Sequence, residues 1–295
     1  MYCCSVKTAP AFAISILTGN SPRPGSLNAN SLPHRQAVVH SVYRKTVNVL
    51  YDGTLLSLQA ADTVLSPISL ITPLSAAEIS ALPVSEGERV AIDTANCKIQ
   101  DLTFAPKLSP GELDCLTKRL EAVLSESEAS GFADTVVRSR AETRMRAAAE
   151  AIRRNRFPDA AEELTGLIGL GGGLTPGGDD FLCGVLAAIR LLDASEPSAK
   201  LPDAAAEAHE AVTPVRIFAD CLKAQIRLHL QDTNSISSAF LSCALRDQFS
   251  FPVVHLPQAA SAEEIRSAFS AVGHSSGFDT LAGIYFLLTQ GRLFS

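Results

Sequence analysis

The spacing of apolar residues changes near residue 108, and this change constrains the fold more than any other feature of the sequence. Before it, short runs of β-branched and aromatic residues alternate with turn signals, which is typical of strands. After it, apolar residues recur every three or four positions, as they do in amphipathic helices. We therefore expect an α+β protein, with a β-rich domain over residues 1–107 and a mostly α-helical domain over residues 108–295.

The clearest turn signal in the N-terminal part is Asp52-Gly53, which separates two runs of strand-forming residues. Glycine tolerates the positive φ of a tight turn, so the pair predicts a β-hairpin. We expect the apolar residues 11–17 to be extended, and residues 19–32, rich in Gly, Ser, Asn and Pro, to form a loop. Further short strands are expected within residues 38–50, 64–71, 89–92 and 98–104.

Capping boxes mark two helix starts in the C-terminal part, at Ser109–Glu112 and Ser261–Glu264. A helix is expected from Pro158 to near Gly166, and residues 204–230 are expected to be helical with a break at Pro214. An alanine-rich helix is expected from residue 141. Four arginines spaced along this region predict a solvated helix face: Arg138, Arg140, Arg144 and Arg146.

Composition excludes several classes of function. A net charge of −6 argues against a dedicated nucleic-acid binder, which would carry a basic surface. No apolar run approaches the roughly 20 residues of a membrane span, so no membrane association is expected. The seven cysteines are odd in number and show no zinc-binding spacing. With no convincing signal peptide, these features favour a reduced, cytoplasmic compartment.

Residues 169–178 contain six glycines and lead directly into an apolar helical stretch. Ordering so many glycines costs backbone entropy, and one compensating reason is the approach of backbone N–H groups to an anion. The alternative is a tight connection between helices with an aspartate cap. On the first interpretation, the anion-binding residues are Gly171, Gly172, Gly173, Thr175, Gly177 and Gly178.

A second segment repeats this pattern about a hundred residues later. Residues 178–184 and residues 277–283 both read Gly-x-Asp-x-Leu-x-Gly, with Asp180 and Asp279 in equivalent positions. Aspartate and glycine lie four apart in each, so they share a helix face. If the last glycines of the two motifs face each other, the aspartates meet. We expect catalytic roles for Asp180, Asp279 and His274, with Ser275 and Ser276 among the anion-binding residues; a duplicated packing motif with capping aspartates is the alternative.

The string Gly-Gly-Gly-Leu-Thr-Pro-Gly-Gly-Asp-Asp-Phe-Leu-x-Gly, with the late Gly-His-Ser-Ser-Gly-x-Asp-Thr-Leu-x-Gly, resembles a bacterial family of long-unassigned function. That family includes the AllH-type subunit of oxamate carbamoyltransferase. The resemblance runs from about residue 38 to residue 288 and is strongest at the two glycine–aspartate motifs.

This resemblance implies a subunit that acts with two larger partner subunits in anaerobic allantoin degradation. The complex converts oxalurate and phosphate to oxamate and carbamoyl phosphate, and no cofactor is implied for this chain. Two alternatives remain open: a non-catalytic assembly subunit of the same complex, or a standalone Mg²⁺-dependent hydrolase using Asp179, Asp180 and Asp279.

Overall fold

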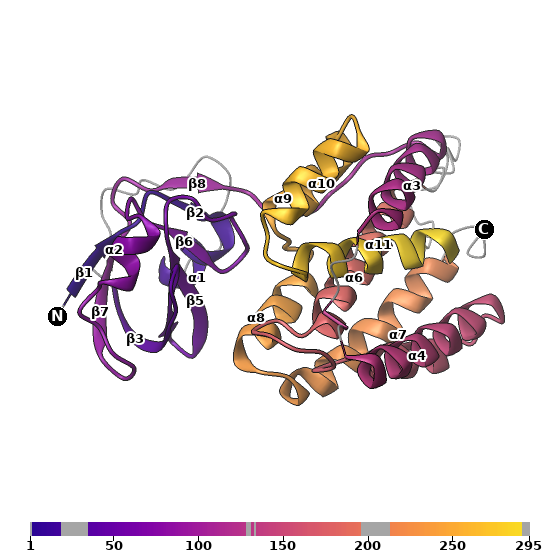
Figure 1. Cartoon of the computed structure of the whole chain (residues 1–295), viewed down its shortest axis with the longest axis horizontal. Coiled ribbons are helices and arrows are strands. Elements are labelled where there is room, and N and C mark those ends of the chain that lie inside the picture. The colour runs from indigo at the N-terminus through magenta and orange to yellow at the C-terminus, as the bar shows by residue number, and fades with distance from the viewer. Residues whose placement is uncertain (1, 19–34, 128–130, 133, 196–212, 291–295) are drawn as a thin grey trace, which may run out of the picture. The chain divides into compact units, whose positions relative to one another are not determined.

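The computed structural model describes residues 2–18, 35–127, 131–132, 134–195 and 213–290 (Figure 1). The expected loop at residues 19–32 and the expected helical residues 204–212 lie outside these ranges. The chain divides into two compact units. The first comprises Met1–Thr103 and Gln248–Val254, and the second comprises Phe104–Asp247 and His255–Ser295. The strands lie in the first unit and the long helices in the second, which confirms the α+β fold class.

The first unit is built on one mixed sheet of eight strands in the order β1-β7-β3-β4-β5-β6-β2-β8. The pairs β1–β7, β5–β6 and β2–β8 are parallel, and the others are antiparallel. The strands and short helices of this unit are β1 (Tyr2–Ser5), β2 (Thr8–Pro10), α1 (Ala11–Thr18), β3 (Arg35–Val42), β4 (Thr46–Tyr51), β5 (Thr54–Gln59), β6 (Ser69–Ile71), α2 (Ala76–Ser80), β7 (Arg89–Asp93) and β8 (Lys98–Gln100).

The expected hairpin at Asp52-Gly53 is confirmed, because β4 and β5 pair on either side of it and both turn residues have positive φ. The extended conformation expected for residues 11–17 is wrong, since this segment is helix α1. Its buried residues Ala13, Ile14 and Leu17 follow helical spacing, and they join the core formed by the sheet. The run at residues 38–50 is two strands rather than one, because a turn at Arg44-Lys45 separates β3 from β4.

The second unit consists of helices, which are coloured from magenta to yellow along the chain in Figure 1. Their bounds are α3 (Pro110–Ser125), α4 (Thr135–Arg153), α5 (Phe157–Thr165), α6 (Gly177–Ser195), α7 (Pro214–His229), η2 (Leu230–Asp232), α8 (Ser235–Ala244), α9 (Phe251–His255), η3 (Leu256–Gln258), α10 (Ala262–Ser270) and α11 (Ser276–Gln290). The first residues of α9 belong to the first unit. Within the described residues, no helix has the length and apolarity needed to cross a membrane.

Local sequence explains several helix boundaries. Helix α3 begins with the expected capping box, in which Ser109 and Glu112 exchange hydrogen bonds between side chain and backbone. Helix α10 begins with Ser261 as its cap, but Glu264 accepts the N–H of Ala260 instead of completing the box. Helix α5 ends at Thr165 with Gly166 as its C-cap, as expected. Helix α7 begins at Pro214, where proline suits the first turn, and the expected break of a longer helix at this residue stays a prediction.

Candidate functional site

The two glycine–aspartate motifs meet where α6 crosses α11 (Figure 1). A Cβ atom added to Gly184 would lie 2.0 Å from the carbonyl oxygen of Thr280, and one added to Gly283 would lie 1.9 Å from that of Phe181. Phe181 and Thr280 occupy equivalent positions in the two motifs, so the crossing has local two-fold symmetry. The glycines therefore face each other as the sequence predicts, and they allow backbone contact that no side chain would permit.

The first glycines of the motifs serve the same purpose against different neighbours. A Cβ atom on Gly178 would lie 1.9 Å from the carbonyl oxygen of Leu167, and one on Gly277 would lie 2.0 Å from that of Phe269. Each motif is thus fixed at both ends by close backbone contacts. This packing fixes the helix starts that carry the aspartates.

Asp279 binds the backbone of Gly131, a residue that the sequence did not connect with the motif. Its carboxylate is buried, and Oδ1 and Oδ2 accept the N–H of Gly131 at 3.1 and 2.8 Å. A Cβ atom on Gly131 would lie 2.6 Å from the same carboxylate, so only glycine fits at this point. Gly131 lies in no recognisable motif, and the sequence carries no signal for this contact.

Asp179 is likewise buried and tied to the backbone. Its Oδ1 accepts the N–H of Gly169 at 2.9 Å, and its Oδ2 accepts the hydroxyl of Thr233 at 2.5 Å. Burial raises the pKa of Asp179, while hydrogen bonds from Thr233 and Gly169 oppose that rise. Asp179 therefore links the glycine-rich segment to Thr233, which lies just before α8.

Asp180 lies between these two anchors and differs from both. Its Oδ2 atom is buried and accepts no hydrogen bond from the residues that the structure describes. Burial raises its pKa to about 8, and the negative charges of Asp279 and Asp179 add to this rise, whereas the hydroxyls of Thr175 and Ser276 lower it. This raised pKa favours the protonated form of Asp180 at neutral pH, and its Oδ2 has no partner among the described residues.

The hydroxyl groups expected around the site are brought together in part. Thr175 and Ser276 hydrogen-bond to each other at 2.7 Å across the two motifs. The backbone carbonyl of Ser275 accepts the N–H of Asp279. His274 is exposed and makes no hydrogen bond within the described part of the chain.

The glycine-rich segment owes much of its composition to backbone geometry. Gly169, Gly171 and Gly173 have positive φ values of 71°, 123° and 92°, a region that favours glycine. Gly177 lies against Gly131, where its added Cβ would be 3.0 Å from the Cα atom. The N–H of Gly178 donates to the carbonyl of Leu170, so this amide is not available to an anion.

Two backbone N–H groups of the segment fit the expected anion site better. Gly172 and Gly173 are exposed, and their N–H groups make no hydrogen bond to other described residues. Space for a side chain exists at Gly172, where an added Cβ would meet nothing within 4 Å. The exposed tip of the segment, rather than its buried end, is therefore the part open to a ligand.

A cavity of about 240 Å³ lies beside Asp279. Phe132, Phe181, Phe278 and Arg138 are among the residues that line it. The Nε of Arg138 donates to the carbonyl of Phe132 at 3.0 Å, which fixes one wall. Among the described residues, no three His, Cys, Asp or Glu side chains lie close enough together to form a metal site.

Two family models match the chain. One, described as oxamate carbamoyltransferase subunit AllH, matches residues 167–288 and so includes both glycine–aspartate motifs. The other, described as the AllH family N-terminal domain, matches residues 16–109. No curated protein and no solved structure matches the chain.

Proposed function

The chain belongs to the AllH family of oxamate carbamoyltransferase subunits, and from this membership we propose that it takes part in transferring the carbamoyl group of oxalurate to phosphate. The products of this reaction are oxamate and carbamoyl phosphate. The observation that carries the proposal is the pair of family models, which match residues 16–109 and 167–288. The proposal includes two larger partner subunits, as in the complex that the family resemblance implies, and a role in anaerobic use of allantoin nitrogen in the cytoplasm.

The proposed chemistry needs a proton for the leaving group. A phosphate oxygen attacks the carbamoyl carbon, the bond from that carbon to nitrogen breaks, and the nitrogen must gain a proton to leave as the amide of oxamate. We assign this proton to Asp180, because its raised pKa keeps it protonated at neutral pH and its Oδ2 has no described partner. A carboxyl group poised in this way suits a general acid.

Negative charge also develops on the carbamoyl oxygen during the attack, and hydrogen-bond donors would stabilise it. The N–H groups of Gly172 and Gly173 and the hydroxyls of Thr175 and Ser276 are the proposed donors. His274 stays a predicted further donor. Asp279 lies in the first turn of α11, and both of its oxygens accept the N–H group of Gly131. We assign it a positioning role there.

The test is to co-express the chain with the two partner subunits and to assay carbamoyl phosphate formed from oxalurate. We expect Asp180→Asn to lower kcat about 100-fold or more while the complex still assembles, since the amide cannot supply the proton. Asp220→Asn, at an exposed aspartate on α7, is the matched control and should keep full activity.

Two outcomes would contradict this assignment. Full activity of the partner subunits without this chain would exclude a catalytic or structural requirement for it. Full activity of the Asp180→Asn complex, combined with loss of activity when the chain is omitted, would favour the assembly-subunit alternative.

A further inference from the structure

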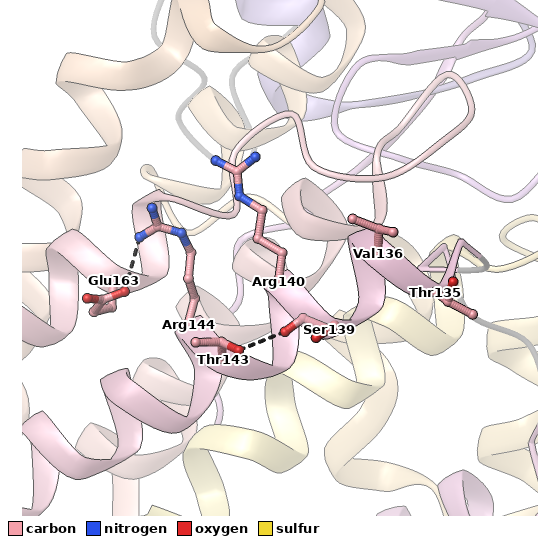
Figure 2. Close-up of a pocket in the computed structure, with 7 residues that line it drawn as sticks. All are labelled: Thr135, Val136, Ser139, Arg140, Thr143, Arg144 and Glu163. Atoms are coloured by element: carbon pink, nitrogen blue, oxygen red, sulfur yellow. Dashed lines mark hydrogen bonds and ion pairs between the residues drawn. The ribbon is translucent and has the colours of Figure 1, made fainter.

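Helix α4 presents two parallel rows of side chains to an open surface cavity of about 700 Å³ (Figure 2). Most of the residues that line it are exposed, and only Arg144 and Glu163 are half-buried. Thr135, Ser139 and Thr143, spaced four residues apart, form a row of hydroxyl groups. The second row is Val136, Arg140 and Arg144, and Glu163 of α5 completes the lining. The spacing predicted a solvated face, and three of the four arginines are exposed: Arg138, Arg140 and Arg146. Arg140 and the half-buried Arg144 also line the hollow.

Arg144 is held in place on one side of this cavity. Its Nη1 atom pairs with Glu163 Oε2 at 3.0 Å. Its guanidinium also packs on Gly166, where an added Cβ atom would lie only 2.3 Å from the Arg144 Cζ atom. Gly166 is the C-cap of α5, so the negative end of that helix favours the cation there. Glu163 engages Nη1 alone, which leaves Nε and Nη2 as donors.

Arg140 is placed beside Arg144 without a counter-charge of its own. It lies one helical turn earlier, and Figure 2 shows both guanidinium groups extending to the same side of α4. It forms no ion pair or hydrogen bond with the residues that the structure describes. The seven lining residues therefore carry two positive charges and one negative charge.

Other arginines of α4 are used differently. Arg138 donates to the carbonyl of Phe132, and Arg153 pairs with Glu150, as does Arg154 at the C-cap of the helix. Arg146 is exposed like Arg140 but does not line the cavity. Arg140 thus combines a charge without a partner among the described residues with a hollow, a fixed second guanidinium and neighbouring hydroxyl donors.

We propose that this cavity binds a small oxyanion, a carboxylate or a phosphate, between Arg140 and Arg144. Guanidinium groups bind both kinds of anion with paired hydrogen bonds, and the Ser139 hydroxyl supplies a further donor. Arg144 is fixed before binding, so little ordering is needed when the anion enters. The choice of ligands rests on the proposed function, because oxalurate carries a carboxylate and its co-substrate is phosphate.

The test is calorimetric titration of the full chain at constant ionic strength, with inorganic phosphate in one arm and oxalurate in the other. We expect one of the two to bind, and Arg140→Gln to weaken that binding about 10-fold or more. Arg146→Gln is the matched control, because it removes the same charge from the same helix outside the cavity. Its affinity should equal that of the unaltered chain, and the arm that responds identifies the anion.

Three results would overturn the inference. The first is that the unaltered chain binds neither anion, and the second is that Arg140→Gln binds as tightly as the unaltered chain. The third is that Arg140→Gln and Arg146→Gln lose affinity equally, as a general charge effect requires. These results are distinct from failure of the proposed function. If the complex is active but this chain binds no anion, only this site is refuted. Selective loss of binding in Arg140→Gln supports the site even if no carbamoyl phosphate is formed.

Discussion

Three aspartates lie in the first turns of α6 and α11, and their hydrogen bonds indicate different roles. Asp179 accepts hydrogen bonds from the N–H group of Gly169 and from the Thr233 hydroxyl. Both oxygens of Asp279 accept the N–H group of Gly131. Such bonds offset the cost of burying a carboxylate. Asp180 has a buried oxygen without a described donor, and burial raises its pKa to about 8. Protonation lowers the free-energy cost of burying the carboxyl group of Asp180. Hydrogen-bond donors lower the same cost for Asp179 and Asp279.

This difference predicts how stability depends on pH. The pKa of Asp180 rises from 3.8 to about 8 on folding, so between these values the folded chain holds a proton that the unfolded chain releases. The stabilisation from that proton is fully present below about pH 4 and falls as pH rises towards 8, by at most about 1.4 kcal/mol per pH unit. Asp180→Asn cannot ionise, so urea unfolding at pH 5, 7 and 9 should show a flatter profile and higher stability than the unaltered chain at pH 9.

The control for this measurement is Asp220→Asn, which removes an exposed carboxyl group from α7. Its pH profile should follow that of the unaltered chain. Parallel profiles for Asp180→Asn and the unaltered chain would mean that Asp180 ionises normally in the folded state, and the general-acid assignment would then lose its basis.

At the scale of elements, the crossing of α6 and α11 depends on glycine. An alanine at position 184 would bring its Cβ within 2.0 Å of the Thr280 carbonyl oxygen, so the two helices must move apart. We expect Gly184→Ala to lower the free energy of unfolding by about 1–3 kcal/mol or more, measured by urea titration. Gly111→Ala in α3 meets nothing within 4 Å and should be neutral or stabilising by up to about 1 kcal/mol. Equal effects of the two substitutions would contradict the close crossing.

Sequence reasoning succeeded at this scale wherever a local cause acts. The Asp52-Gly53 turn, the Ser109 capping box and the end of α5 near Gly166 each depend on a few adjacent residues. It failed for residues 11–17, because a short apolar run does not distinguish a strand from a buried helix. Strands β1 and β2 were missed for a related reason, since segments of four and three residues carry no periodicity.

The candidate site shows the same division between local and tertiary causes. The repeated Gly-x-Asp-x-Leu-x-Gly pattern predicted that Gly184 and Gly283 would face each other, because identical motifs favour symmetric packing. It did not predict Gly131 or Thr233 as partners of Asp279 and Asp179, since both lie far away in the chain and in no motif. Their positions depend on tertiary packing, which no spacing within the motif encodes.

At the scale of the whole molecule, the N-terminal unit is discontinuous in sequence. Residues 248–254 belong to it although most of the C-terminal half does not. Phe249 N–H donates to the carbonyl of Leu102, and Phe251 N–H donates to that of Leu65. Gln248 forms a β-bridge with Thr103, and Val254 packs against the cluster of Leu65, Ile71 and Leu102. The stability of the first unit therefore depends on residues almost 150 positions beyond its last strand.

This dependence predicts that a distant substitution loosens the first unit selectively. Val254→Asp sets a carboxylate against the apolar cluster of Leu65, Ile71 and Leu102, which should cost about 1–3 kcal/mol because that cluster offers the charge no partner. Hydrogen exchange should accelerate in β5 and β6, the strands that pair beside this cluster, and should remain unchanged in α6 and α11 of the second unit. Leu228→Asp, at a residue 67% exposed on α7, is the control and should change neither unit. Acceleration confined to the second unit would show that residues 248–254 stabilise the helices instead, and would contradict their assignment to the sheet.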